Sequence, residues 1–287
     1  MNRRLEISAF CLMLLYLCPG ISANSAEELT LKDKAERAYK SDELATLAKS
    51  SDIEVRARVA ENLNTPEAVL LSLAGSMKLS TYAENDDRDV FFALLKNPSL
   101  PASVFSVLAK KALLDWDFTD HPRAPLTFIL QRLIRDDLYK KGEPDYEEFQ
   151  TLVSMQGKAS DGQILDFMSR AKNFSLVKIA ARNAATLPAS LRALYLRSKA
   201  DRSVGEGIGE SIGESIKEYL AENPALPEDI MEALSHEKDN DIRAHLAENA
   251  NCPNAVLERL AKEEERYVAE KAMKTYYYKN GGVLLRP

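Results

Sequence analysis

The first residues that could do chemistry are those around Ser211. Residues 209–213 read Gly-Glu-Ser-Ile-Gly, which matches G-x-S-x-G, the turn that presents the nucleophilic serine of α/β-hydrolases. Asp229, Asp239 and His245 follow in the order that a catalytic triad would need. That turn requires a preceding strand and a parallel sheet, and the sequence contains no run of strands. We therefore expect no catalytic residue; the alternative is a helical-repeat hydrolase or lyase that uses the glycine-rich segment 205–213.

The same segment has the periodicity of a helix. Ile208, Ile212 and Ile216 recur every four residues, with glutamates on an adjacent stripe. The glycines at the same spacing are Gly205, Gly209 and Gly213. Together they would form a helix face that a ligand or a partner helix can approach closely. Tight packing inside the fold is the alternative interpretation.

No group of residues has the spacing of a metal or cofactor site. An EF-hand loop begun in the acidic cluster at 115–121 needs a glycine at its sixth position and a glutamate at its twelfth, where the chain has Asp120 and Leu126. His236 and His245 lie on either side of a repeat turn and do not share the helix face that a zinc site uses. We expect no cofactor and no metal.

Two groups of aromatic residues are candidates for a partner surface. Trp116 and Phe118 lie in a segment of atypical sequence, and three tyrosines follow one another near the C-terminus. These tyrosines are Tyr276, Tyr277 and Tyr278. Tyrosine and tryptophan are enriched at binding hot spots, although a lone tryptophan in a helical protein is more often part of the core.

The elements that would position such residues come from an internal repeat. Residues 55–74 read VRARVAENLNTPEAVLLSLA, and residues 242–261 read IRAHLAENANCPNAVLERLA. Further copies are centred on Asn97 and Asn223, and a looser one on Asn183. Repetition at this period is typical of a fold in which small units stack, because one unit cannot bury its apolar face alone.

Each unit predicts two helices that meet at its asparagine. Before it, Val55, Val59 and Ala60 lie on one helix face. We expect the asparagine to end this helix in the left-handed conformation. The proline four residues later is expected at the first position of the second helix. Arg56 and Arg243 share one repeat position, and we expect them to pair with acids of the neighbouring unit.

This pattern resembles the leucine-rich repeat variant family, over about two-thirds of the chain that would remain after signal removal. The resemblance implies alternating α- and 3₁₀-helices in a right-handed superhelix. The predicted fold class is therefore all-α, an α–α (α/3-10) superhelical solenoid, with HEAT-like repeats as the near alternative. The iron–sulfur cysteine cluster known in one branch of that family has no counterpart here. Among the three cysteines, Cys252 occupies the repeat position of Thr65 and Leu100, so we expect a packing residue.

The first residues have the pattern of a secretory signal. Asn2-Arg3-Arg4 precedes an apolar stretch from Ile7 to Cys18, and small residues follow. We expect residues 1–25 to be removed and the protein to be exported, to a periplasm or to the outside, with no stable membrane insertion afterwards. An uncleaved anchor is the alternative, but the stretch is shorter than the roughly 20 residues that span a bilayer.

The remaining chain divides by how well it follows the repeat. We expect repeats at 26–110, a degenerate or inserted helical segment at 111–160, repeats at 161–275 and a flexible tail at 276–287. The net charge of −6 disfavours a nucleic-acid partner, which requires a basic surface. The sequence thus predicts a non-catalytic scaffold that binds a protein or peptide, with a structural envelope component as a further alternative.

Overall fold

The computed structural model describes residues 30–78, 87–97, 99–109, 121–135, 145–200 and 211–282. Within these ranges every element is an α-helix, so the predicted all-α class is confirmed. The 3₁₀-helices that the family resemblance implies do not occur in these ranges. The helices of the first half are α2 (Leu31–Arg37), α3 (Ser41–Leu47), α4 (Ile53–Glu61), α5 (Glu67–Ser76), α6 (Arg88–Lys96), α7 (Ala102–Leu108), α9 (Leu126–Arg135) and α10 (Tyr146–Met155). Those of the second half are α11 (Asp161–Ser169), α12 (Phe174–Arg182), α13 (Pro188–Ala200), α14 (Ile212–Glu222), α15 (Glu228–Leu234), α16 (Asn240–Glu248), α17 (Asn254–Leu260) and α18 (Arg266–Lys279).

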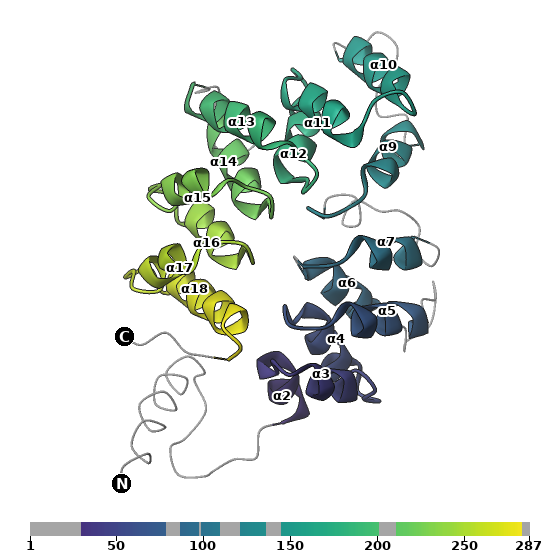
Figure 1. Cartoon of the computed structure of the whole chain (residues 1–287), viewed down its shortest axis with the longest axis vertical. Coiled ribbons are helices and arrows are strands. Elements are labelled where there is room, and N and C mark those ends of the chain that lie inside the picture. Colours follow the sequence, from purple (N-terminus) through teal and green to yellow (C-terminus); the bar gives the residue numbers. More distant parts are fainter. Residues whose placement is uncertain are drawn as a thin grey trace.

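The helices lie in two columns that α9–α12 connect (Figure 1). The helix that precedes each repeat asparagine packs on its counterpart in the next unit, which makes an inner row: α2 on α4, α4 on α6, α12 on α14, α14 on α16 and α16 on α18. The second helices pack in an outer row, as α5 does on α7 and α11 on α13. Val55, Val59 and Ala60 are fully buried between these rows, as their spacing predicts.

The repeat asparagines do not adopt the left-handed conformation that we expected. Their φ angles are −70° at Asn62, −77° at Asn97 and −72° at Asn223. Positive φ among the described residues occurs at Gly157, Gly281 and Gly282. The prediction was wrong because the asparagine is selected by its side chain and not by its backbone.

The asparagine side chain joins one unit to the one before it. Asn223 Nδ2 donates to the carbonyls of Ala181 at 2.7 Å and Asn183 at 2.9 Å, and its Oδ1 accepts from the Ala225 amide at 2.7 Å. Asn249 repeats this arrangement on the carbonyls of Ala221 and Asn223, both at 2.9 Å. We call this set of bonds the asparagine ladder; its members are Asn62, Asn97, Asn183, Asn223 and Asn249, all buried.

His121 takes the place of an asparagine in the same ladder. Its Nε2 lies 3.0 Å from the Asn97 carbonyl, and its Nδ1 accepts from the Arg123 amide at 3.0 Å. Pro125 follows four residues later, so a copy of the repeat is present inside the segment that we treated as degenerate. Asn183 then donates to the Ala124 carbonyl at 3.1 Å. The ladder thus joins Ala124 directly to Asn183, and the chain between them forms α9, α10 and α11 outside the ladder.

Two boundaries differ from those that the sequence predicts. Most of the prolines before the second helices lie one residue earlier than expected, at the N-cap, as Pro66 and Pro253 show, whereas Pro188 is the first residue of α13 as predicted. The predicted flexible tail begins inside α18, which continues to Lys279.

The end of α18 lies against α2, so the first and last described helices are in contact. Tyr278 Oη donates to the Glu36 carbonyl, and Tyr277 Oη lies 3.3 Å from the Arg37 carbonyl. Lys274 forms an ion pair of 3.3 Å with the Glu36 carboxylate. The inner row therefore closes on itself at this seam.

Candidate functional site

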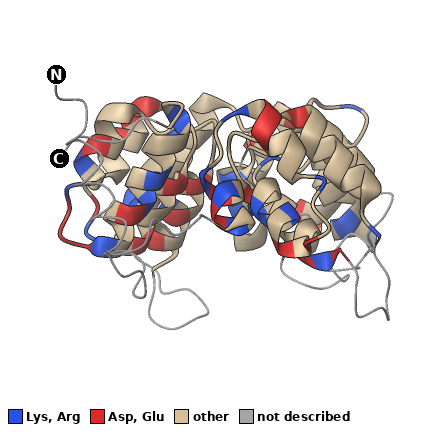
Figure 2. Ribbon diagram, turned by 90° about the horizontal axis from the view of Figure 1, so that it is seen from below, with Lys and Arg blue, Asp and Glu red and all other residues tan. Residues whose placement is uncertain are grey.

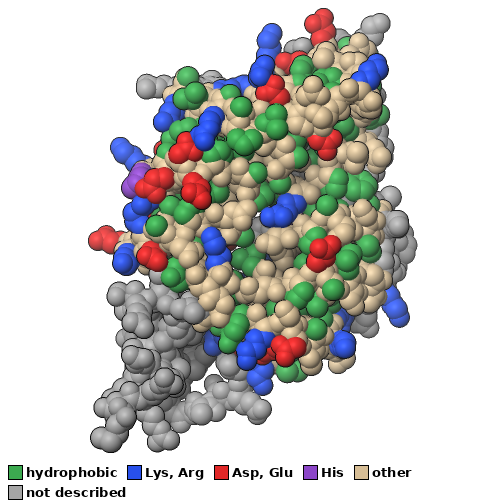
Figure 3. All heavy atoms as spheres, in the orientation of Figure 1, with side chains coloured by type: hydrophobic (Ala, Val, Ile, Leu, Met, Phe, Trp, Pro, Cys, Tyr) green, Lys and Arg blue, Asp and Glu red, His purple; other side chains and the backbone are tan. Residues whose placement is uncertain are grey.

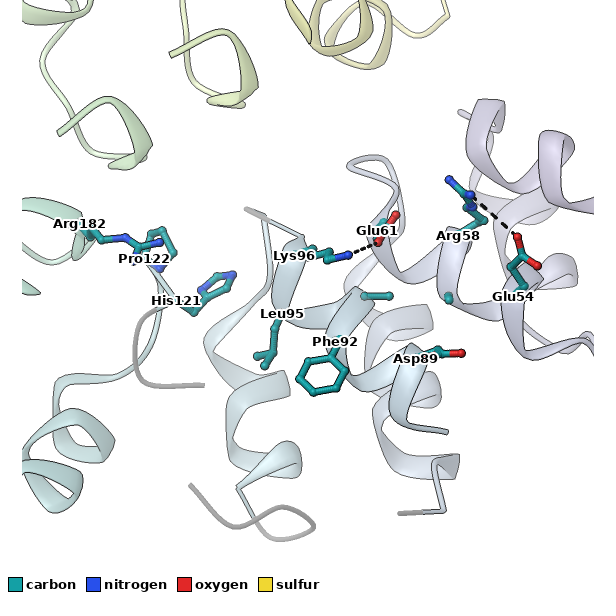
Figure 4. Close-up of a pocket in the computed structure, with 12 residues that line it drawn as sticks. Glu54, Arg58, Glu61, Asp89, Phe92, Leu95, Lys96, His121, Pro122 and Arg182 are labelled. Carbon is teal, nitrogen blue, oxygen red and sulfur yellow. Dashed lines mark ion pairs between the residues drawn. The ribbon is translucent and has the colours of Figure 1, made fainter. Parts of the chain in front are cut away.

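A hollow of about 830 Å³ opens on the inner face of α4 and α6 (Figure 4). On the face of the molecule drawn in Figure 3, hydrophobic and charged side chains are interspersed. Ribbon colouring shows acidic and basic residues mixed along the helices (Figure 2). The residues that line the hollow are Glu54, Ala57, Arg58, Glu61, Asp89, Phe92, Ala93, Leu95, Lys96, His121, Pro122 and Arg182.

Two alanines in the wall of the hollow, Ala57 of α4 and Ala93 of α6, occupy repeat positions where α12 and α14 carry larger residues, although α6 has Phe92 and α4 has Arg58 at the same two positions. Ala57 lies five residues before its ladder asparagine, and the same position in α12 is Lys178. Ala93 lies four residues before Asn97, where α14 has Tyr219. Comparison of the repeats position by position could have revealed this difference in the sequence.

The inner face of α12, α14 and α16 is filled by side chains that contact one another. The Arg182 guanidinium lies 2.5 Å from the Glu222 carboxylate and stacks over the Tyr219 ring at 5.7 Å. Lys178 lies over the same ring at 5.4 Å, and His245 Nδ1 is 3.7 Å from Glu222. These contacts leave α4 and α6 as the more open part of the inner face.

The α6 side of the hollow presents three different groups in a row. Asp89, Phe92 and Lys96 follow the i, i+3, i+7 spacing of one helix face and all line the hollow (Figure 4). Phe92 is 37% exposed, and its ring lies edge-on to that of Phe91 with the centroids 5.5 Å apart. Lys96 is 73% exposed and reaches Glu61 at 3.7 Å. Such an exposed pair contributes about 0–1 kcal/mol and separates readily.

The remaining charges of the hollow are paired, with the exception of Asp89. Arg58 lies 3.5 Å from Glu36 and 3.9 Å from Glu54. Asp89 is exposed and forms no ion pair with any residue that the structure describes. The hollow therefore offers one free carboxylate, one accessible phenyl ring and one loosely held ammonium group.

His121 forms part of the wall and remains neutral. Burial lowers its pKa from 6.5 to about 4, although the bond to the Asn97 carbonyl favours the charged form. Arg182 and Arg123 oppose protonation further. The Arg123 amide needs an unprotonated Nδ1 as its acceptor, so the neutral ring is the form that the ladder requires.

The serine, aspartates and histidine that we weighed as an alternative catalytic triad make other contacts among the described residues. The Ser211 hydroxyl accepts from the Glu214 amide at 3.1 Å and caps α14. His245 and His236 contact glutamates instead, and His121 contacts backbone. Ser211 is therefore used as a helix cap.

The sequence-predicted partner residues are scattered. Trp116, Phe118, Gly205 and Gly209 lie outside the described residues. Gly213 is buried in the first turn of α14. Of the three tyrosines, Tyr278 is buried at the seam with α2, Tyr277 also reaches α2, and Tyr276 packs against the core. None of the described candidates lines the hollow.

Two other predictions concern the repeat itself. Cys252 is fully buried, and burial raises the pKa of its thiol to about 12, so the prediction of a packing residue is confirmed. Arg56 pairs with Asp87 ahead of α6, and Arg243 lies 2.9 Å from Glu263 ahead of α18. The predicted pairing of this position with acids of the next unit is therefore confirmed.

Neither a metal cluster nor a membrane span is found in the part of the chain that the structure describes. No three metal-binding side chains of His, Cys, Asp or Glu come together there. None of the described helices has both the length and the hydrophobicity needed to cross a bilayer.

Comparison with known proteins leaves the chain without an assigned family. No family model and no curated protein matches it. A crystal structure of an engineered protein aligns over 85% of this chain and 82% of its own, with 14% identity and a TM-score of 0.28.

Proposed function

We propose that this chain is an exported, non-catalytic scaffold that binds a segment of a protein partner in the hollow of α4 and α6. The observation that carries the proposal is the exposed Phe92 side chain among charged residues in the lining of a hollow of about 830 Å³. Binding sites are concave and combine apolar contacts with polar groups that fix orientation, and the lining of this hollow has five apolar and seven ionisable residues. The charged rim of this hollow supplies such groups.

The proposal includes a fold of the solenoid type related to leucine-rich repeat variants. The asparagine ladder and the inner row of helices support it, because successive units contact one another through them. Export is proposed from the signal-like pattern of residues 1–25. Sequencing the N-terminus of the protein purified from the envelope or the culture medium tests it; an intact Met1 would contradict it.

Affinity capture from the same source tests the binding function. We expect the wild-type chain to retain a partner, and Phe92→Ala to reduce the amount captured by about tenfold or more, since truncation of a binding hot spot costs about 2 kcal/mol. Leu196→Ala is the matched control, because Leu196 is 65% exposed on α13, in the outer row. Equal capture by Phe92→Ala and Leu196→Ala would reject the site.

A second variant fills the hollow without removing any group. Ala93→Tyr introduces the residue that α14 carries at the same repeat position, so the fold has a precedent for it. Ala93 is buried, however, so circular dichroism must show intact helices first. We expect capture to fall as it does for Phe92→Ala. A folded variant that captures normally would place the partner elsewhere.

A further inference from the structure

The row of side chains along α6 restricts what the hollow accepts, and this inference rests on the proposed function. Asp89, Phe92 and Lys96 present a carboxylate, an apolar ring and an ammonium group in that order. Each is exposed, so each can meet a group of the partner. Chemical complementarity to this row requires a cation, an apolar group and an anion in the matching order.

We propose that the partner segment is an extended peptide in which a large apolar residue is flanked by one basic and one acidic residue. The basic side chain pairs with Asp89, the apolar side chain covers Phe92, and the acidic group replaces Glu61 as the partner of Lys96. The exchange of partners costs little, because Glu61 and Lys96 form an exposed pair at 3.7 Å.

The lengths agree with such a peptide. Asp89 and Lys96 are separated by about 10 Å along the helix axis at 1.5 Å per residue. In an extended chain every second side chain points to the same side, and residues i and i+4 are about 13 Å apart. Lysine and arginine are long enough to cover the difference. The pattern is therefore basic-x-apolar-x-acidic, in either chain direction.

The charges of the neighbouring helices favour this assignment over a uniformly charged partner. Arg182 and Arg58, which also line the hollow, are held by Glu222 and by Glu36 and Glu54. They offer no additional unpaired cation to a strongly acidic peptide. A strongly basic peptide would meet Asp89 but would be repelled by Lys96. One charge of each sign is the combination that α6 accommodates.

Selection from a library of random seven-residue peptides displayed on phage tests the proposal on the full chain. The wild type is expected to enrich peptides with one basic and one acidic residue around an apolar residue. Asp89→Lys is expected to enrich peptides with two acidic flanks, and Lys96→Glu peptides with two basic flanks. Lys199→Glu, on α13 of the outer row, is the matched charge control and should select as the wild type does.

The outcomes separate this inference from the proposed function. The proposed basic-x-apolar-x-acidic pattern, here called the charge rule, would be overturned if the peptides selected by the wild type, Asp89→Lys and Lys96→Glu had the same flanking charges. It would also be overturned if no peptide were enriched. Partner capture that depends on Phe92 would then still support the hollow as the binding site. If Phe92→Ala captures the partner as well as the wild type does, while the selected peptides still depend on the charges at positions 89 and 96, the charge rule holds for short peptides. The proposal that the natural partner binds in the hollow would then be rejected.

Discussion

At the scale of the residue, the ladder asparagine is the most informative position in the chain. Its amide group donates to the backbone of the preceding unit while its carbonyl oxygen holds the turn that follows it. Aspartate lacks the donor, and glutamine is longer by a methylene, so neither reproduces both contacts. This dual role explains why asparagine returns at all the joints except that of His121, although its backbone conformation would suit most amino acids.

Replacement of one ladder asparagine should be costly. Asn223→Ala leaves the buried carbonyls of Ala181 and Asn183 without this donor, and we expect the free energy of unfolding to fall by about 3 kcal/mol. Asn251→Ala, which removes an exposed bond to the Pro224 carbonyl, is the control and should cost under about 1 kcal/mol. Urea denaturation followed by circular dichroism measures both; equal losses would contradict the ladder.

His121 should make stability depend on pH. Its pKa is about 4 in the folded chain and 6.5 as the reference value, so the unfolded chain binds the proton more tightly. The stability that the neutral His121 contributes to the folded chain is fully present above pH 6.5 and is lost as the pH falls from 6.5 to 4. It amounts to at most about 3 kcal/mol.

The replacement His121→Asn tests that origin, because asparagine is the residue that the other joints use. We expect the variant to be as stable as the wild type at pH 7.5 and more stable than it at pH 4.5. Carboxylates elsewhere titrate in both proteins and cancel in the difference. A difference that does not change with pH would show that His121 is not the source.

At the scale of the element, the C-terminal helix has a role that its sequence conceals. The tyrosines of α18 read as an exposed cluster, yet Tyr278 is only 6% exposed and reaches the backbone of α2. Burial raises the pKa of its hydroxyl. A contact between residues about 240 positions apart cannot be predicted from a local pattern, because the sequence around Tyr278 gives no indication that Glu36 lies nearby.

Removal of the Tyr278 hydroxyl should loosen the seam without unfolding the chain. Tyr278→Phe retains the buried ring and loses the bond to the Glu36 carbonyl. Hydrogen–deuterium exchange is expected to increase at the amides of α2, while those of α13 stay protected. Unchanged exchange in α2, even for Tyr278→Ala, would indicate that the seam does not stabilise the first helix.

The helix pairs of the repeats were the most predictable elements. The segment at 111–160, which departs from the repeat, was the least predictable. Periodic apolar residues fix the buried face of each inner helix regardless of what surrounds it. His121 was missed because it replaces asparagine by function and not by residue type: both offer a donor and an acceptor at suitable distances. A search for the proline spacing alone, His121 to Pro125, would have located this unit.

At the scale of the whole molecule, the rows of helices determine where a partner can bind. The inner face has a first half from α2 to α6 and a second half from α12 to α18, joined at the turn that contains His121. The second half is filled by paired side chains such as Arg182 and Glu222. The hollow lies beside α4 and α6 in the first half, where Ala57 and Ala93 form part of its wall. The sequence predicted a binding surface in stacked repeats and yet directed attention to the segments that interrupt them. Phe92 lies instead inside a regular unit, where exposure depends on the neighbouring helices.

The central claim is that a partner contacts Phe92 in the hollow, and photo-crosslinking tests it most directly. A photoreactive benzophenone amino acid placed at position 92 should form a covalent adduct with the captured partner upon illumination. The same group at position 196, on the outer row, should form none. An adduct from position 196 and none from position 92, in a chain that still captures its partner, would contradict the claim.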